Sequence, residues 1–319
     1  MTKVSIIIPV KEINDYILEF VPIILKQDFK DFEILILPDK FDKLNFAKTK
    51  VIATGHIGPA EKRDIGVKKS KGEIIAFIDD DAYPEKGWLS EAVKIFEDEK
   101  IGIVGGPNLT PEKSNRFQVV SGEALTSWLV SGPVAYRYKK VKRIESDDLP
   151  SCNLIIRKSL FKKIKGFDTS FWPGEDTKLC LDAKNEGYKI IYDPKVAVYH
   201  HRRPNIKGYL KQIGSYGLHR GFFAKRYPET SLKFSYFIPS IFLIGLIIGS
   251  IIGLMIKAVG IVYLIVLMLY VLLVFNEARK NSKFGNWFYF SLIVFLTHIT
   301  YGLKFMNGLF RKSLKSKYR

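Results

Sequence analysis

Cysteine is scarce in this sequence, and its two cysteines, Cys152 and Cys180, show no metal-ligand spacing. We therefore expect both to be reduced thiols in a cytosolic domain. A glycine-rich phosphate loop is also absent, which disfavours a sugar nucleotidyltransferase. The first residues lead directly into a strand-like run, so we expect no signal peptide.

Acidic residues are outnumbered, because 32 Asp and Glu stand against 50 Lys and Arg, for a net charge of +18. No basic-aromatic recognition module accompanies this charge, so we expect no nucleic-acid partner. The apolar excess lies after about residue 234, and the basic residues lie before and between the apolar runs. Basic residues that flank apolar spans indicate contact with anionic lipid.

The first third of the chain alternates strand-like and helix-like segments. Strands are expected at residues 4–10, 33–37, 50–54, within 72–82 and at 101–104. Helices are expected at residues 15–27, 59–70 and 88–98. This alternation predicts an α/β fold with a mostly parallel sheet and helices on both faces.

Three consecutive carboxylates, Asp79-Asp80-Asp81, end the apolar strand within residues 72–82, and Tyr83-Pro84 is expected to stop that strand. Ligands bind at the carboxyl ends of strands in open α/β sheets. Adjacent carboxylates repel one another, and oxygen ligands of this kind suit Mg²⁺ or Mn²⁺ next to substrate phosphates. The alternative interpretation is a solvated acidic turn.

A second constellation lies in the middle third. A strand at residues 149–157 and a turn at 166–168 precede a helix that opens within residues 172–177, with Glu175 and Asp176 in its first turn. These two residues are either helix caps or a positioned general base. A strand at residues 189–199 ends in His200-His201-Arg202-Arg203, a combination that suits metal and phosphate, although a histidine pair can also be structural.

These patterns together make the chain resemble a family 2 glycosyltransferase with a GT-A catalytic domain, over about residues 3–205. No single motif is decisive, but their order and spacing are specific. The motifs are Ser5-Ile6-Ile7-Ile8-Pro9-Val10, Arg63-Asp64-Ile65-Gly66, Phe77-Ile78-Asp79-Asp80-Asp81, Asn153, Gly166-Phe167-Asp168, Gly174-Glu175-Asp176, Asp193-Pro194 and His200. We therefore expect a catalytic domain at residues 1–204.

The resemblance implies roles for these residues. Asp79 faces the nucleotide sugar, Asp81 binds Mg²⁺ or Mn²⁺ with Asp79, and His200 is a further metal ligand. Asp176, with Glu175 beside it, supplies the catalytic base. The second strand departs from the family pattern, because Pro38-Asp39-Lys40-Phe41 retains only one of two usual aspartates. The expected nucleotide-sugar-binding residues are Pro9, Val10, Glu12, Asp39, Arg63, Asp64, Asp79, Asp80, Arg202 and Arg203.

The sequence of the last third predicts a membrane region at residues 234–319, preceded by a basic amphipathic interfacial linker at 205–233. Runs at 234–256 and 258–275 are long enough to span, and a third run at 287–305 precedes a basic tail. The basic linker and the source of nucleotide sugars favour a multi-pass protein of the cell membrane with a cytosolic catalytic domain. We favour a third span at 287–305, which puts the tail outside; the alternative is that this run lies in the interface and the tail stays cytosolic.

The predicted activity is inverting transfer from a nucleotide-diphospho-sugar donor to a hydroxyl of a lipid-linked or membrane-bound glycan acceptor. A polyprenyl-phosphate glycosyltransferase is the main alternative. A phosphate acceptor is already anionic and needs no base, so Glu175-Asp176 favours the hydroxyl. A non-catalytic nucleotide-sugar binder is disfavoured by the joint presence of Asp79-Asp80-Asp81, Asp176 and His200.

Overall fold

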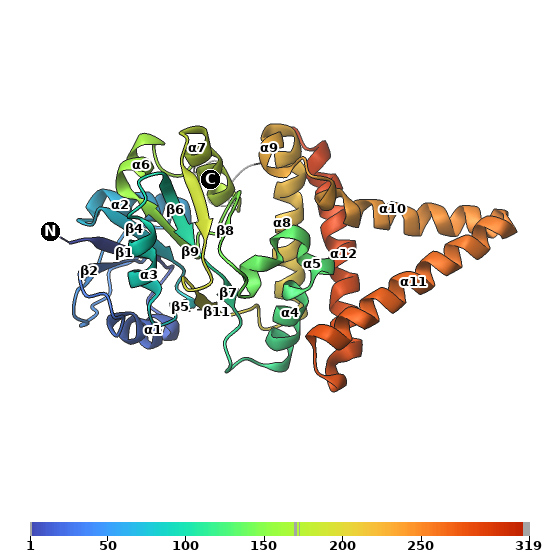
Figure 1. Cartoon of the computed structure of the whole chain (residues 1–319), viewed down its shortest axis with the longest axis horizontal. Coiled ribbons are helices and arrows are strands. Elements are labelled where there is room, and N and C mark those ends of the chain that lie inside the picture. Colours follow the sequence, from blue (N-terminus) through green and yellow to red (C-terminus); the bar gives the residue numbers. More distant parts are fainter. Residues whose placement is uncertain (1, 169–170, 172, 315–319) are drawn as a thin grey trace. The chain divides into compact units, whose positions relative to one another are not determined.

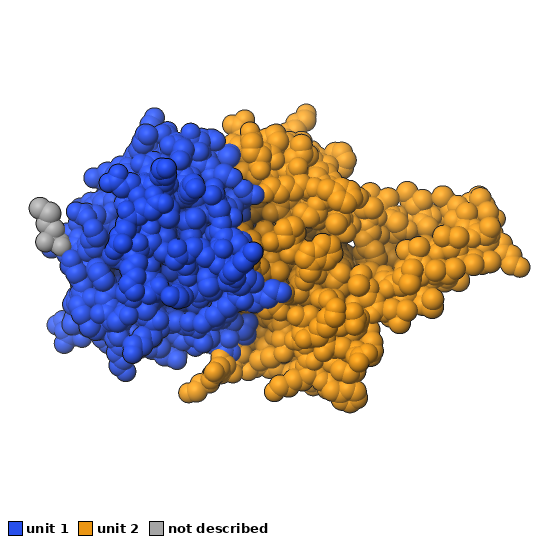
Figure 2. All heavy atoms as spheres, in the orientation of Figure 1, with its two compact units in different colours: residues 1–111, 139–201, 315–319 blue, residues 112–138, 202–314 orange. Residues whose placement is uncertain are grey.

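The computed structural model describes residues 2–168, 171 and 173–314. Within these residues the chain forms two compact units, which Figure 2 colours separately. Unit 1 contains residues 2–111 and 139–201, and unit 2 contains residues 112–138 and 202–314. The last five residues of the predicted basic tail, 315–319, lie outside the described residues.

Unit 1 is built on an eight-stranded sheet, which confirms the predicted α/β fold with a mostly parallel sheet (Figure 1). The strand order is β3-β2-β1-β4-β9-β6-β10-β8, and β9 and β8 run antiparallel to their neighbours. The strands are β1 (Val4–Pro9), β2 (Phe32–Leu37), β3 (Thr49–Val51), β4 (Ile74–Ile78), β6 (Ile101–Gly105), β8 (Ile144–Glu145), β9 (Asn153–Arg157) and β10 (Lys189–Tyr192).

The central strands are apolar because both of their faces are buried, as in parallel sheets covered by helices. All of β1 and all of β4 are buried. The helices of unit 1 are α1 (Asp15–Leu25), α2 (Pro59–Lys69), α3 (Trp88–Ile95), α6 (Lys158–Lys163) and α7 (Glu175–Asn185). The helix predicted to open within residues 172–177 is α7; residue 172 itself lies outside the described residues.

Several strand predictions were wrong in extent: β9 begins at Asn153 instead of residue 149, and β3 ends at Val51 instead of residue 54. The run 189–199 is not one strand, because Asp193 and Pro194 divide it into β10 in the large sheet and β11 (Val198–His200) in a second sheet. Proline lacks the N–H that a continuing ladder requires, and the Val196 N–H donates to the Asp193 carbonyl in a turn. Tyr83 and Pro84 do not end strand structure either, since β5 (Ala82–Pro84) joins β11 and β7 (Asn108–Leu109) in the small sheet.

Unit 2 is helical. Its helices are α4 (Arg116–Thr126), α5 (Trp128–Ser131), η1 (Gly132–Tyr138), α8 (Ile206–Arg226), α9 (Pro228–Ser231), α10 (Phe234–Met255), α11 (Lys257–Asn281), η2 (Phe284–Asn286) and α12 (Trp287–Phe310). Among the residues that the structure describes, three segments are long and apolar enough to cross a membrane: Phe234–Met255, Lys257–Asn281 and Phe284–Phe310. They coincide with the three predicted apolar runs.

The limit between the units differs from the predicted domain boundary. Residues 112–138, expected within the catalytic domain, pack in unit 2, and unit 1 ends at His201 instead of residue 204. α4 buries Phe117, Val120 and Ala124 in the same cluster as Tyr209 of α8 and Phe290 of α12. These apolar residues belong to no recognisable motif, and the residues that they contact are distant in sequence. Their packing with α8 and α12 could therefore not be predicted from the sequence.

Candidate active site

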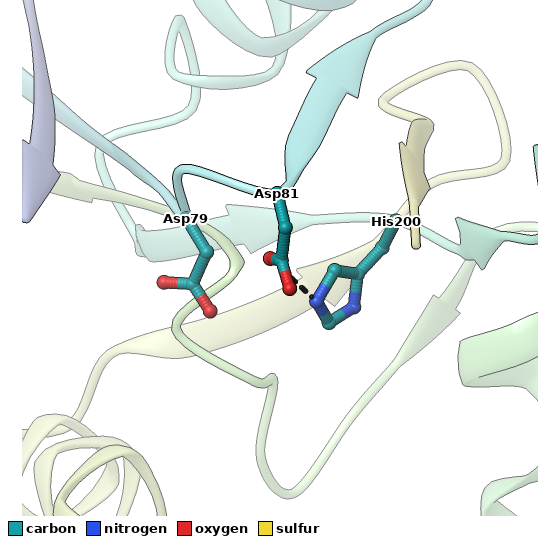
Figure 3. A group of neighbouring side chains, drawn as sticks. All are labelled: Asp79, Asp81 and His200. Carbon is teal, nitrogen blue, oxygen red and sulfur yellow. Dashed lines mark ion pairs between the residues drawn. The ribbon is translucent and has the colours of Figure 1, made fainter. Parts of the chain in front are cut away.

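Three side chains meet where the turn after β4 joins the small sheet. β5 pairs antiparallel with β11 so that Ala82 lies opposite His200, and the His201 N–H donates to the Asp81 carbonyl over 3.0 Å. This pairing carries His200 to the turn that holds Asp79 and Asp81 (Figure 3). One ligand atom of each of these three residues lies within 4.8 Å of the other two.

The donor set of this group fits a divalent cation. Nε2 of His200 lies 3.0 Å from Oδ1 of Asp81. Burial alone would lower the pKa of His200, but the Asp81 carboxylate and the Cys152 thiol raise it well above its usual value. Two carboxylates and one imidazole are ligands that suit Mn²⁺ or Mg²⁺. Within the described ranges, it is the one such three-residue group close enough to hold an ion.

A buried arginine ties this turn to the start of α7. Nη2 of Arg63 donates to Oδ1 of Asp79 over 2.7 Å, and Nη1 donates to Oε1 of Glu175 over 3.2 Å. Arg63 lies on the face of α2 that packs against the sheet, where a Cβ on Gly66 would lie 2.7 Å from Ile7. The guanidinium therefore compensates the buried Glu175 carboxylate and the partly exposed Asp79 carboxylate with one cation.

The start of α7 separates the acidic pair into a buried and a partly exposed carboxylate. Gly174 adopts φ 114°, a conformation that favours glycine, directly before the helix. Glu175 is 3% exposed, and burial raises its pKa with help from Asp176, against the effect of Arg63. Asp176 is partly exposed and accepts from the N–H groups of Ser151 over 3.2 Å and of Thr177 over 2.7 Å. Asp176 is thus the carboxylate that is both oriented and accessible.

The middle carboxylate of the triplet has a different contact. Nδ2 of Asn14 donates to Oδ2 of Asp80 over 2.6 Å, while Oδ1 of Asn14 caps α1 by accepting from the Ile17 N–H. Burial, with Asp81 nearby, raises the pKa of Asp80 to about 6. Asp80 therefore links the turn to α1, and its predicted donor contact stays a prediction.

The end of β2 holds a buried ion pair that the sequence did not predict. Lys62 of α2 is 3% exposed and contacts both the Val10 carbonyl and Oδ1 of Asp39. His56 Nδ1 lies 2.9 Å from the other oxygen of Asp39. Although burial opposes it, these contacts lower the pKa of Asp39. The available signal was the position of Lys62 one turn before Gly66, on the helix face that covers the sheet.

The other predicted donor-binding residues have varied surroundings. Pro9 and Val10 are buried at the end of β1, whereas Glu12 is exposed. Asp64 accepts from the Phe167 N–H over 3.1 Å, and burial raises its pKa to about 6. These roles are untested and stay predictions.

The two predicted diphosphate-binding arginines belong to unit 2. The Arg202 side chain is buried with its guanidinium 5.2 Å from the centre of the Tyr138 ring, and its carbonyl accepts from Gln118. Arg203 is exposed. Their role in binding the diphosphate stays a prediction.

The sequence pattern of Glycosyl transferase family 2 matches residues 5–165, which include α2, β4 and the carboxylate triplet. The chain belongs to this family. The pre-mycofactocin glycosyltransferase of Mycobacterium tuberculosis is 27% identical over 172 residues, which are 54% of this chain and 36% of that enzyme. The present chain therefore matches about a third of the length of this relative.

A second relative extends further along the chain. The dolichyl N-acetyl-alpha-D-glucosaminyl phosphate 3-beta-D-2,3-diacetamido-2,3-dideoxy-beta-D-glucuronosyltransferase of Methanococcus voltae is 24% identical over 249 residues, 71% of this chain and 75% of that enzyme. Among solved structures, the mannosyltransferase PcManGT of Pyrobaculum calidifontis, in complex with GDP-Man and Mn²⁺, has a TM-score of 0.57 at 16% identity. It covers 98% of this chain and 88% of its own, which shows that the fold is shared and is GT-A-like.

Proposed function

We propose that this protein is a membrane-bound, inverting glycosyltransferase that moves a sugar from a nucleotide-diphospho-sugar to a hydroxyl of a lipid-linked or membrane-bound glycan. The observation that carries the proposal is the group Asp79, Asp81 and His200, joined through Arg63 to the helix that presents Asp176. The Methanococcus voltae relative, whose name includes a dolichyl-linked sugar, supports an acceptor of this class.

In the proposed reaction, Asp79, Asp81 and His200 would hold Mg²⁺ or Mn²⁺, which as a Lewis acid would offset negative charge on the diphosphate leaving group. Asp176 accepts the proton of the acceptor hydroxyl as its oxygen bonds to the anomeric carbon. The bond from that carbon to the diphosphate oxygen breaks, and the nucleoside diphosphate leaves. A single displacement of this kind inverts the anomeric configuration.

The position of Asp176 fits a general base. Two backbone N–H groups fix its carboxylate, and the first turn of an 11-residue helix stabilises its charged form. Glu175 fits a positioning role, because it is buried against Arg63. A general base contributes roughly 10²–10⁴-fold to a rate, and a phosphate acceptor would not need one.

The test uses the full chain in detergent with radiolabelled UDP-, GDP- and dTDP-sugars, added Mn²⁺ or Mg²⁺, and a membrane lipid extract as acceptor source. We expect metal-dependent transfer of label into a lipid-extractable product that resists mild acid. A product labile to mild acid would instead indicate a sugar on a lipid phosphate, the polyprenyl-phosphate alternative. Absence of transfer with every donor and extract would contradict the proposal.

A further inference from the structure

The three apolar helices of unit 2 are not equivalent. The most apolar windows of α10 and α11 have mean hydropathies of 2.5 and 2.9, and 6% of each is buried inside the protein. The window in Phe284–Phe310, which contains α12, has a mean hydropathy of 1.3, and 33% of it is buried. A larger share of α12 is therefore covered by protein contacts, whereas α10 and α11 are almost entirely exposed.

The main partner of α12 is α8, and the two helices run side by side in the same direction. Near their first halves, the Tyr209 and Thr297 hydroxyls lie 2.9 Å apart. At their ends, Nζ of Lys225 donates to the Arg311 carbonyl over 2.7 Å. The contact thus extends over most of α8 and the second half of α12.

Glycines bring these two helices into backbone contact between those points. A Cβ on Gly221 of α8 would lie 2.0 Å from the Phe305 carbonyl oxygen, and a Cβ on Gly308 of α12 would lie 2.0 Å from the Leu218 carbonyl oxygen. Real Cβ atoms do not approach so closely, so each glycine is required by the packing. Helices held together in this way share their orientation and their depth relative to a membrane.

α8 cannot cross a bilayer. Charged side chains at the bilayer centre are costly and rare, and α8 is not among the described helices apolar enough to span. Its basic residues lie near its start and throughout its second half: Lys207, Lys211, Arg220, Lys225 and Arg226. Since α12 is packed along α8 in the same direction, a bilayer that excludes α8 would also prevent α12 from crossing.

The start of α12 is fixed near the point where the chain leaves unit 1. Arg116 donates from Nε to Oδ1 of Asn286 over 2.9 Å and from Nη2 to the Gly285 carbonyl over 2.7 Å. Arg116 follows Pro111, the last residue of the first segment of unit 1, by only five residues. Because Arg116 contacts the loop between α11 and α12 and is only five residues from unit 1 in sequence, we expect this loop to lie on the membrane side where the chain leaves unit 1.

One exposed face of α12 is apolar along its whole length. Its exposed apolar residues recur at helical spacing: Phe288, Leu292, Phe295, Leu303 and Phe310. Another exposed face carries Lys304 and Asn307. α10 and α11 lead away crosswise to the axis of α12 (Figure 1), and Ser240 of α10 donates to the Gly302 carbonyl over 3.0 Å at the crossing.

We propose that α12 lies along the membrane surface beside α8, with its apolar face in the lipid, and that the α10–α11 hairpin alone crosses the bilayer. This is the alternative to the three-span topology favoured from the sequence, and it keeps the basic tail on the membrane side where the chain leaves unit 1. It agrees with the preference of basic residues for the cytosolic side. The proposal concerns topology alone and holds whichever sugar or acceptor is used.

Cysteines introduced one at a time into the full-length chain, which keeps its two native cysteines, test this topology. Ala258→Cys probes the tip of the hairpin, Gly285→Cys the loop before α12, and Ser313→Cys the segment after it; all three residues are exposed. The two native cysteines are free and buried, so the unmodified chain measures background labelling. An impermeant maleimide is applied to intact cells and again after permeabilisation.

We expect positions 285 and 313 to label from the same side and position 258 from the other. Labelling of 285 and 313 from opposite sides would overturn the proposal, because α12 would then cross. Labelling of all three positions from one side would overturn it as well, because the hairpin would then not cross.

A matched pair of charged substitutions gives a second readout. Leu303→Lys lies on the exposed face of α12, and Leu269→Lys lies in the middle of α11; both leucines are more than half exposed. At the membrane surface the lysine of Leu303→Lys can reach water, so we expect its membrane-fraction level within about twofold of the unmodified chain. Leu269→Lys should reduce that level severalfold. Equal losses from both substitutions would contradict a surface position for α12.

Discussion

The candidate active-site group of unit 1 and the α8–α12 contact of unit 2 are built in opposite ways. The site depends on what its side chains are, since Arg63 must be a cation between Asp79 and Glu175. The contact depends on what is missing, since Gly221 and Gly308 must carry no side chain. Changing a charge should therefore damage chemistry or local electrostatics in unit 1, while adding a methyl group should damage packing in unit 2.

The largest effect is expected at the proposed cation site of Asp79, Asp81 and His200. Asp81→Asn removes a charge from this group, and we expect transfer to fall by roughly 10³-fold or more, because Lewis-acid compensation by a bound cation would contribute several kcal/mol. Asp182→Asn is the matched control, since Asp182 pairs with Lys178 on the side of α7. Initial rates with labelled donor measure both variants. Similar rates for the two would break the assignment of Asp81.

Removing the buried guanidinium of Arg63 should have the next largest effect, and this effect should be on stability. Arg63→Met leaves Asp79 and Glu175 without their partner, and breaking a buried ion pair costs about 3–5 kcal/mol. Lys184→Met removes a partner from the exposed pair with Asp147, where about 0–1 kcal/mol is expected. Thermal unfolding of the full chain in detergent compares them. If Arg63→Met shifts the midpoint no more than Lys184→Met, Arg63 does not hold the site together.

The proposed base should affect turnover without affecting donor binding. Asp176→Asn keeps an acceptor for the Ser151 and Thr177 N–H groups but cannot take a proton. We expect turnover to fall by roughly 10²-fold or more, with the affinity for the nucleoside diphosphate unchanged within about twofold in a calorimetric titration. Normal turnover would place the base elsewhere or indicate a phosphate acceptor.

Adding a methyl group at Gly221 tests the close packing of α8 against α12. Gly221→Ala should destabilise the full chain by about 1–3 kcal/mol, the usual cost of overpacking, because its Cβ would meet the Phe305 backbone. Gly245→Ala is the control, since nothing lies within 4 Å of its Cβ. Unfolding midpoints in detergent distinguish them. Equal midpoints would mean that α8 and α12 do not pack through their backbones.

The smallest expected effect is a pH dependence within unit 1. Burial raises the pKa of Asp64 from 3.8 to about 6, so its protonated form is favoured in the folded state. This contribution to stability is present below pH 4 and is lost as pH rises through about 6. Asp64→Asn mimics the protonated form and should be more stable above pH 6 by on the order of 1–2 kcal/mol. A stability difference that does not change between pH 4 and 7 would contradict the raised pKa.

How much of each unit could be predicted from the sequence depends on the same difference between charged side chains in unit 1 and glycine packing in unit 2. The triplet Asp79-Asp80-Asp81 and the pair Glu175-Asp176 are chemically conspicuous, so the sequence predicted the family, which is confirmed, and a candidate site, whose residue roles stay predictions. The bridge from Arg63 to Glu175 joins residues 112 positions apart, and only the folded sheet brings α2 to the start of α7. The break of the expected strand 189–199 was signalled by Asp193-Pro194, but the run of apolar residues on either side concealed it.

The helices of unit 2 show the limit of composition as a predictor. Hydropathy identified all three apolar runs, yet it measures how apolar a helix is and not which partner covers it. α12 is partly covered by α8 through glycines that have no periodic signature of their own. Likewise, the packing of residues 112–138 with α8 and α12 depends on Phe117 and Val120, which resemble any other core residues.

The proposed function depends above all on a divalent cation held by the group Asp79, Asp81 and His200. Transfer of labelled sugar by the full chain is measured before chelation, in excess EDTA, and after Mn²⁺ is restored. We expect EDTA to abolish transfer, and Mn²⁺ to restore it in the unmodified chain but not in Asp81→Asn. Full transfer in EDTA would show that the reaction needs no divalent cation and would contradict the proposed function.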